Sequence, residues 1–572
     1  MYQTTIAFTN ATTGNASVGI MSTANLMADA SSLYSEEKGY GFVIERNRNE
    51  QELLQLPELN SAFSTWYWDN GKELTVLKDT DAGATISDSS AYEPAVLPLS
   101  FKLKLPHQGN YQLTLTVTAG EKGCDNLTVF TGRRHLAVRN VSLQAKEVRT
   151  LTFTVNVCDI IPRGKEEAYT DTTLDITLFG SQVALTALTV EEVDVHTIYI
   201  AGDSTVTDQS GAYPYDAGCC YSGWGQMLSA YLKPGIAVSN HAHSGLTTES
   251  FRSEGHYDIV KRFIKKGDYY LMQFAHNDQK LPHLDAAGGY RARLIAYVEE
   301  IRSVGGIPVI VTPLARNTWK GDGTYNDLLV NYAAECIRVG KEYDVPVIDL
   351  HKFSMDFVLK EGLDSAKRYY YPKDYTHTND YGAYLMAECI ASGLAQIEEL
   401  KDFVISEAPD RWNPPAIVAL PTPPEGCEIE KVSVLPAEHE LERPQEIITR
   451  VEFLNYLVKT VGYVPMNVYN DMYPDVIGHE WYAGVVEVSY QNALVNPEYT
   501  SDGSFHPLEP VTWEQLISFS INGYKSRKAS AQAEDELALA KKLGIAPCDF
   551  QPDAQVTRLE ALSSLKALEG VL

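Results

Sequence analysis

Four short apolar segments that alternate with helical stretches constrain the fold of this 572-residue chain more than any other feature. The apolar segments span residues 197–201, 269–274, 307–312 and 345–350. The helical stretches lie near residues 223–232, 288–303, 325–341 and 381–399. A strand followed by a helix, repeated, is typical of a parallel sheet that helices cover on both faces. We therefore expect an α/β domain over residues 195–405.

The segment before this block, residues 1–194, has the apolar pattern of β-strands. Apolar side chains occupy every second position in residues 101–105, 113–117 and 151–157, which is the period of a half-buried strand. Turn signals such as Gly109-Asn110 separate the runs. Short strands at this spacing predict an antiparallel β-sandwich.

An imperfect repeat marks the end of the chain. Residues 406–430 are rich in Pro and predict a linker, and residues 431–572 predict a mainly helical module. Segments that begin at Thr449, Thr512 and Thr557 each open a helix-like stretch. In each segment we expect the Thr to cap the helix and a following Glu to close a capping box.

The charge and composition of the chain limit which partners and which cellular location can be expected. The 47 basic and 75 acidic residues give a formal net charge of −28, so neither nucleic acid nor a membrane surface is expected as a partner. The chain has no run of eighteen apolar residues and does not start like a signal peptide. We expect a cytoplasmic protein, or a secreted or cell-surface one if a leader has been removed. The eight cysteines form no CxxC pair and no Cys/His cluster at metal spacing, so we expect no metal and no other cofactor.

Four polar segments follow the predicted strands of the α/β block and carry the candidate chemistry. In chain order they are Gly202-Asp203-Ser204-Thr205, residues 240–245, residues 274–278 and Asp374-Tyr375-Thr376-His377. Because right-handed crossovers bring the carboxyl ends of parallel strands to one edge, we expect all four segments at the same edge of the sheet. A Ser hydroxyl beside a His that an Asp orients can act as a nucleophile, with the His taking its proton.

These segments resemble the motifs of the SGNH (GDSL-like) hydrolases, and specifically of rhamnogalacturonan acetylesterases, over residues 198–390. The resemblance implies a flavodoxin-like parallel sheet and a Ser-His-Asp triad. It also implies an oxyanion hole built from two backbone N–H groups and one side-chain amide, each donor typically being worth about 3 kcal/mol in the barrier. The triad residues would be Ser204, Asp374 and His377, and the oxyanion-hole residues Ser204, Gly245 and Asn277.

Three aromatic residues are candidates for substrate binding, because aromatic faces suit pyranose rings. They are Trp224, Trp319 and Tyr325, and packing in the core or at its rim is an equal interpretation for all three. Two segments near the motifs depart from the family pattern. Ala275 stands where the family often has Gly, and Leu246-Thr247 where it often has Arg-Ser, which alters how an acidic sugar would be held.

The flanking parts resemble two further families. The N-terminal part is similar to galactose-binding-like sandwiches through Lys38–Phe42, and its Trp66-Tyr67-Trp68 cluster suits either carbohydrate contact or the interior of the sandwich. Docking against the α/β domain is an alternative role for this part. The C-terminal part is similar to S-layer homology domains through Thr449–Glu452, Pro474–Val476, Trp481–Ala483 and Phe505–Thr512. Its role, cell-wall binding or packing and homo-oligomerisation, stays open.

Together these features predict a serine carboxylic ester hydrolase that removes O-acetyl groups from a plant polysaccharide or its oligosaccharides. Rhamnogalacturonan, a pectin, is the first choice of substrate, and acetylated xylan or mannan is the alternative. A non-catalytic carbohydrate- or wall-binding protein is the rival from another class. A lipid or thioester hydrolase on the same fold is a second rival, which predicts an apolar tunnel rather than a shallow cleft.

Overall fold

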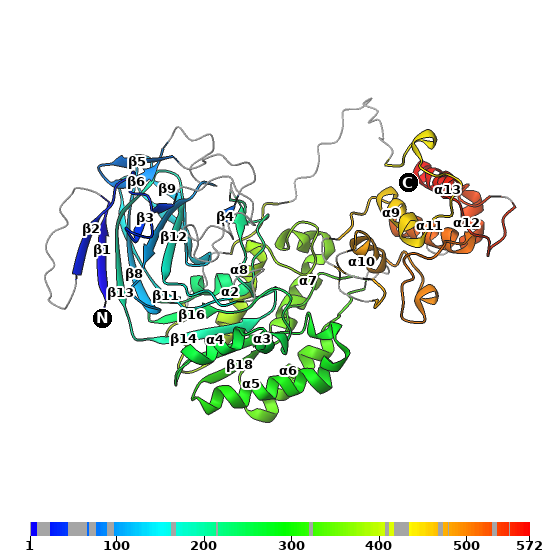
Figure 1. Cartoon of the computed structure of the whole chain (residues 1–572). Helices are drawn as coiled ribbons and strands as arrows, with labels where there is room; N and C mark the ends of the chain where they lie inside the picture. The colour runs from blue at the N-terminus through cyan, green and yellow to red at the C-terminus, as the bar shows by residue number, and fades with distance from the viewer. Residues whose placement is uncertain are drawn as a thin grey trace.

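The computed structural model arranges the chain in three parts, which are β-strands, then an α/β part, then helices (Figure 1). The described residues are 2–8, 23–43, 66–67, 76–87, 96–161, 167–212, 215–319, 324–405, 411–416, 434–466, 469, 473–476, 478, 480–528, 535–547 and 549–572. Of the predicted linker only residues 411–416 are described, and the side chains of the Trp66-Tyr67-Trp68 cluster lie outside the described residues. The domain boundaries drawn from the sequence stay a prediction.

Two β-sheets make up the first part, residues 2–192, which we call the N-terminal β region. Their strands are β1 (Gln3–Ala7), β2 (Thr23–Met27), β3 (Tyr40–Val43), β5 (Leu77–Thr80), β6 (Gly83–Ile86), β7 (Leu99–Lys104), β8 (Gly109–Ala119), β9 (Cys124–Thr131), β10 (His135–Leu143), β11 (Val148–Val157), β12 (Thr173–Phe179) and β13 (Val183–Glu192). One sheet has the order β11-β8-β13-β1-β2, with β6 on β13 and β5 on β6, and the other has the order β10-β9-β12-β7-β3. Neighbouring strands are antiparallel except β1 and β2, which are parallel.

A five-stranded parallel sheet forms the second part, as predicted. Its strands are β14 (His196–Gly202), β16 (Ile236–Asn240), β17 (Tyr269–Gln273), β18 (Ile307–Val311) and β19 (Val347–Ile348). The order β16-β14-β17-β18-β19 is that of a flavodoxin-like sheet. The chain leaves β14 for β16 on one side and then crosses to β17 on the other, so a switch point lies at the carboxyl end of β14.

Helices cover both faces of this sheet, because successive side chains of each strand point to opposite faces. The helices are α2 (Trp224–Met227), α3 (Ser250–Ser253), α4 (His256–Phe263), α5 (Arg291–Ser303), α6 (Val330–Tyr343), α7 (Leu350–Ala366) and α8 (Asp380–Leu394). Ile198 and Ile200 belong to the core on one face of β14, and Tyr199 and Ala201 to the core on the other. The predicted strand 345–350 is shorter than expected, since α7 begins at Leu350.

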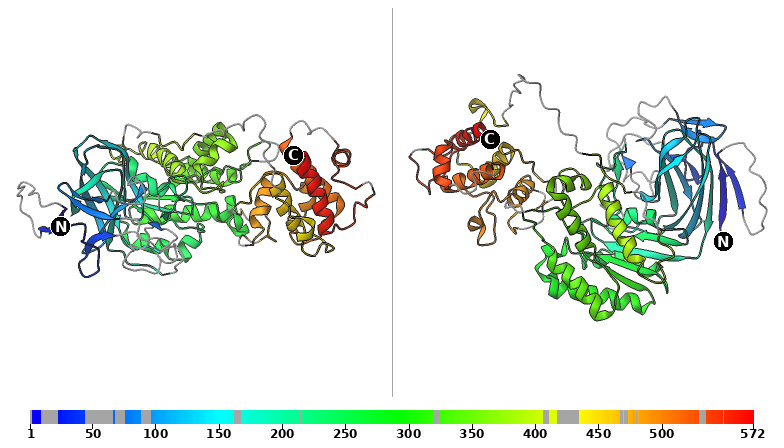
Figure 2. Two further views of the ribbon diagram at one scale, coloured as in Figure 1. Left: turned by 90° about the horizontal axis from the view of Figure 1, so that it is seen from above. Right: turned by 180° about the vertical axis from the view of Figure 1, so that it is seen from behind.

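The N-terminal β region and the parallel sheet share one hydrophobic core. Strand β11 packs against the edge strand β16, and β10 packs against α2. The buried side chains of Leu115, Ile200 and Trp224 belong to the same cluster. The two parts therefore lie side by side, as two further views also show (Figure 2).

The C-terminal part is helical and has a core of its own. Its helices are α9 (Arg450–Thr460), α10 (Ala483–Gln491), α11 (Trp513–Arg527), α12 (Glu536–Lys542) and α13 (Arg558–Val571). Capping boxes open three of them at Thr449, Thr512 and Thr557. The second box is closed by Gln515 and not by Glu514, because the closing side chain must stand three residues after the cap. Within the described residues, no helix is long and apolar enough to span a bilayer.

Candidate active site

Ser204 lies in the tight turn that follows β14, at the switch point of the parallel sheet. Asp203 holds this turn, because its Oδ1 accepts hydrogen bonds from the Thr205 backbone N–H at 2.9 Å and hydroxyl at 2.8 Å. A side chain at Gly202 would come within 2.7 Å of the Gln273 carbonyl oxygen, so the close approach to β17 requires a glycine. The turn directs the Ser204 hydroxyl toward His377, and Oγ lies 2.7 Å from Nε2.

His377 and Asp374 complete a hydrogen-bonded chain with Ser204. The Nδ1–H of His377 donates to Oδ2 of Asp374 at 2.8 Å, which leaves Nε2 to accept the Ser204 hydroxyl proton. Oδ1 of Asp374 accepts the backbone N–H groups of Thr376 at 2.8 Å and His377 at 2.9 Å. Burial alone would raise the pKa of Asp374, but His377 and these hydrogen bonds outweigh it and hold the pKa below its usual value. The carboxylate is therefore charged and can stabilise a protonated imidazole.

Gly245 and Asn277 lie at the same cavity as Ser204 and His377. The cavity has a volume of about 300 Å³ and is lined by Ser204, Gln209, Tyr221, Ser244, Gly245, Asn277 and His377. One hydrogen of the Asn277 Nδ2 group is donated to the Leu246 carbonyl oxygen at 3.0 Å, and the group carries a second hydrogen. Gly245 has φ of +85°, which favours glycine at this position. All five residues predicted for the triad and oxyanion hole are thus brought together.

Three further residues of the cavity were not identified from the sequence. Tyr221 stacks on Tyr371 with ring centroids 3.6 Å apart, and it meets the His377 ring edge-on. The Gln209 amide donates to the hydroxyl of Ser244 at 3.3 Å. Ser244 directly precedes Gly245, so its place in the second polar segment was a usable signal. Gln209 and Tyr221 lie in the loop between β14 and α2, where no sequence pattern marks them.

The three aromatic candidates for substrate binding lie elsewhere. Trp224 is fully buried under the sheet, where its Nε1–H donates to Oε1 of Gln273 at 2.8 Å, so the prediction that it contacts substrate is wrong. Trp319 and Tyr325 form an edge-to-face pair with centroids 5.7 Å apart. Neither of these two lines the cavity at Ser204, so their part in the site is also not supported by the structure.

His276, in the third polar segment, helps to hold the loops together. His276 is buried, its Nδ1 lies 3.2 Å from Oδ2 of Asp203, and its Nε2 lies 2.9 Å from the Leu314 carbonyl oxygen. Burial lowers the pKa of His276 below its ordinary value, although Asp203 opposes the shift. Among the described residues, no group of three or more His, Cys, Asp or Glu side chains is arranged to hold a metal ion.

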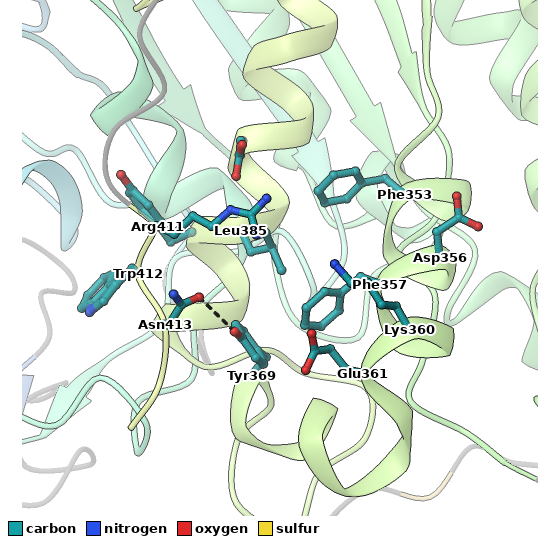
Figure 3. A pocket seen from close by; sticks show the side chains of 12 residues that line it. Phe353, Asp356, Phe357, Lys360, Glu361, Tyr369, Leu385, Arg411, Trp412 and Asn413 are labelled. Atoms are coloured by element: carbon teal, nitrogen blue, oxygen red, sulfur yellow. Dashed lines mark hydrogen bonds between the residues drawn. The ribbon is translucent and has the colours of Figure 1, made fainter. Parts of the chain in front are cut away.

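A second cavity, of about 280 Å³, lies between α7 and α8 (Figure 3). Phe353, Phe357 and Leu385 form apolar walls, and charged side chains including Lys360 and Arg411 lie around them (Figure 3). The Tyr369 hydroxyl donates to Oδ1 of Asn413 at 3.2 Å in this cavity (Figure 3). It contains no member of the hydrogen-bonded chain at Ser204. The groups that acyl transfer needs lie at the first cavity, where a hydroxyl, an imidazole and a carboxylate stand in sequence beside amide donors.

The chain is similar in sequence to a known family and to several known proteins. The model of the GDSL-like lipase/acylhydrolase family matches residues 200–385. The rhamnogalacturonan acetylesterase RhgT of Bacillus subtilis is 33% identical over 223 residues, which is 36% of this chain and 94% of that protein. The rhamnogalacturonan acetylesterase of Emericella nidulans is 25% identical over 246 residues, 37% of this chain and 93% of that protein. Among solved structures, the Bacillus subtilis protein YxiM matches 69% of this chain and 98% of that chain, with 20% identity and a TM-score of 0.35.

Proposed function

Because the chain belongs to the GDSL-like lipase/acylhydrolase family and is a serine carboxylic ester hydrolase, we propose that it removes O-acetyl groups from a plant cell-wall polysaccharide or its oligosaccharides. The observation that carries the proposal is the hydrogen-bonded chain from Ser204 through His377 to Asp374 at an open edge of the sheet. Acetylated rhamnogalacturonan is the first choice of substrate, since relatives with that activity in their names match this chain over nearly their whole length.

The lining of the cavity supports a short acyl group on a sugar. Six of its seven residues carry polar side chains, and the seventh is Gly245. Hydroxyl, amide and imidazole groups suit the hydroxyls of a sugar, whereas a long acyl chain needs an apolar wall. The lining therefore favours an acetylesterase over a lipid hydrolase.

The proposed reaction runs in two acyl-transfer steps. The Ser204 hydroxyl oxygen attacks the acetyl carbonyl carbon while its proton passes to Nε2 of His377. The tetrahedral oxyanion accepts hydrogen bonds from the backbone N–H groups of Ser204 and Gly245 and from the Asn277 amide. The sugar oxygen then leaves with the proton from His377, and acetyl-Ser204 remains. Water, deprotonated by His377, attacks this ester and releases acetate and the free Ser204 hydroxyl.

We also propose roles for the flanking parts. The two sheets of the N-terminal β region support a galactose-binding-like sandwich. In the C-terminal part, Arg450 is buried and donates to the carbonyl oxygens of Tyr499 and Phe505, while Arg558 pairs with Glu452 of the first repeat. Both arginines are thus engaged inside the module. This supports a packing or homo-oligomerising role for an S-layer-homology-like module over a wall-binding one.

Acetate release tests the proposed activity. Purified full-length protein is incubated with acetylated oligosaccharides of rhamnogalacturonan, xylan and mannan and with 4-nitrophenyl esters of increasing acyl length. We expect acetate release, fastest from rhamnogalacturonan, and a loss of about 10⁴- to 10⁶-fold in Ser204→Ala. Ser303→Ala, at the exposed end of α5, is the matched control and should match the wild type. Rapid cleavage of long acyl esters with no acetate from any sugar would contradict the proposal.

A further inference from the structure

The turn that joins β9 to β10 inserts two arginines of the N-terminal β region into the α/β part. Arg133 donates from Nε to Oδ2 of Asp208 at 2.8 Å and from Nη2 to the Asn240 carbonyl oxygen at 2.5 Å. His135, two residues on, lies 3.0 Å from Asp208 as well. The turn is therefore anchored to the loop that follows β14, which carries Ser204, and to the last residue of β16, which leads into the loop with Gly245.

Arg134 reaches deeper and forms a buried ion pair. Its side chain and that of Asp380 are both fully buried, and Nη1 donates to the two carboxylate oxygens of Asp380 at 2.9 and 2.8 Å. The Tyr215 hydroxyl donates to the same carboxylate at 2.8 Å. Asp380 is the first residue of α8 and stands three residues after His377. A buried carboxylate without its cation is costly, so the pair ties the start of α8 to the β9–β10 turn.

The rest of the Arg134 guanidinium holds the wall of the cavity. Nε donates to the Gln209 carbonyl oxygen at 3.0 Å, and Nη2 donates to the Tyr221 carbonyl oxygen at 2.5 Å. Gln209 and Tyr221 both line the cavity at Ser204. A planar guanidinium fixes several acceptors at once, which a lysine ammonium at the same place cannot do.

We propose that Arg134 is a positioning residue of the hydrolase site: it sets the backbone of Gln209 and Tyr221, and through them the wall that receives the sugar. This rests on the proposed function for the identity of the substrate only. The N-terminal β region is then part of the active site rather than an independent module. Arg134 touches no reacting atom, so its effect is on the placement of substrate relative to Ser204.

Lysine and methionine at position 134 test this role in the full-length chain. Arg134→Lys keeps the positive charge beside Asp380 but loses the planar guanidinium with its several N–H donors. Arg134→Met loses both the charge and the donors. Lys102→Met is the matched control, because Lys102 is also a buried cation of the N-terminal β region, paired at 3.0 Å with Asp175, a residue of the same sheet. Each protein is titrated with a serine-directed phosphonate, so that rates are given per active site.

We expect both Arg134 variants to lose up to about 10²-fold in kcat/KM on acetylated oligosaccharide, mainly through KM, and far less on 4-nitrophenyl acetate. Lys102→Met should lower thermal stability and leave the ratio of the two activities unchanged. Hydrogen–deuterium exchange adds a readout that needs no substrate. Peptides covering residues 218–224 should exchange faster in Arg134→Lys than in Lys102→Met.

The outcomes separate this inference from the proposed function. Equal activity ratios and equal exchange in the Arg134 and Lys102 variants would overturn the positioning role. If the wild type cleaves no sugar acetate, the proposed function fails, and the exchange of residues 218–224 alone decides the role of Arg134. If Arg134→Met does not fold, Arg134→Lys carries the test, since it keeps the buried charge.

Discussion

Tyr221 and Tyr371 stack face to face beside the cavity at Ser204, with ring centroids 3.6 Å apart and an angle of 11° between the planes. Tyr221 also meets the His377 ring at 5.8 Å, edge-on, and its hydroxyl lies 3.5 Å from Oδ2 of Asp374. One tyrosine comes from the loop after β14 and the other from the loop before α8. The stack therefore joins the loop that carries Ser204 to the loop that carries His377.

Loss of this stack should weaken substrate binding more than chemistry. An aromatic pair contributes about 0.5–1.5 kcal/mol beyond its burial, so Tyr221→Ala should raise KM for the acetylated oligosaccharide by about 3- to 10-fold. Tyr221→Phe keeps the ring and should stay within about twofold of the wild type. Steady-state kinetics on one oligosaccharide checks both variants. A large kcat loss in Tyr221→Phe would instead assign the hydroxyl a role in the chemistry.

Replacement of the Asp374 carboxylate by an amide should lower kcat about 10⁴-fold with little change in fold. The carboxamide cannot stabilise the charged imidazole, and its N–H side can present the wrong tautomer of His377 to Ser204. Single-turnover acetate release by Asp374→Asn measures the effect. Asp258→Asn, at an exposed position of α4, is the control and should keep full activity. Activity of Asp374→Asn near that of the control would rule out the proposed triad.

Asn277→Ala should lower kcat about 10²- to 10³-fold, because the variant lacks the side-chain amide of the proposed oxyanion hole. KM should change little, since the carbonyl oxygen needs this donor most in the tetrahedral state. The amide also donates to the Leu246 carbonyl oxygen, so thermal melting of the variant must be recorded alongside the kinetics. A rise in KM at unchanged kcat would place Asn277 in substrate binding and not in the oxyanion hole.

Much of the α/β part and its site could be predicted because the relevant signals are local. Buried strands read as short apolar runs, and the polar residues after β14, β16 and β17 fall at one edge once the sheet is parallel. The start of α7 at Leu350 was missed because Val345–Leu350 is equally apolar as a strand or a helix start.

Burial and long-range contacts could not be predicted from the sequence. No sequence pattern around Trp224 indicates whether its side chain is exposed or buried. In the structure the side chain is fully buried. The partners of Arg134 lie far along the chain, so the Thr131–His135 turn reads only as a β-hairpin with two basic residues. Tyr371 likewise could not be identified from the sequence, because its partner Tyr221 lies far from it along the chain.

Acid should destabilise the protein through two buried histidines. Burial lowers the pKa of His241 and of His256 to about 3, whereas the unfolded chain has ordinary values near 6.5. Between these values the unfolded state binds more protons, so each histidine lowers the free energy of unfolding by about 1.4 kcal/mol per pH unit as the pH falls below 6.5. Asp278, whose pKa burial raises to about 6, acts in the opposite direction between about 4 and 6.

The comparison of His256→Gln with the wild type isolates one of these histidines. Urea unfolding at pH 6.0, 5.25 and 4.5 should show a shallower loss of stability in the variant, by about 1.4 kcal/mol per pH unit. The carboxylates with lowered pKa values, such as Asp203 and Asp208, lose their stabilising charge only at lower pH and do not disturb this window. Parallel curves for the two proteins would show that His256 is not held neutral by burial.

Trp224 should matter to stability and not to the choice of substrate. Trp224→Phe removes the hydrogen bond to Gln273 and part of the buried ring, and should cost about 1–3 kcal/mol, while Trp224→Ala should cost about 3–5 kcal/mol. Because the fully buried ring does not line the cavity, kcat/KM per titrated active site should stay within about twofold for Trp224→Phe on both sugar and aryl acetates. Trp319→Phe, at a half-buried position, is the matched control and should cost less stability. A selective loss on the sugar acetate in Trp224→Phe at unchanged stability would restore a part in substrate binding for this residue.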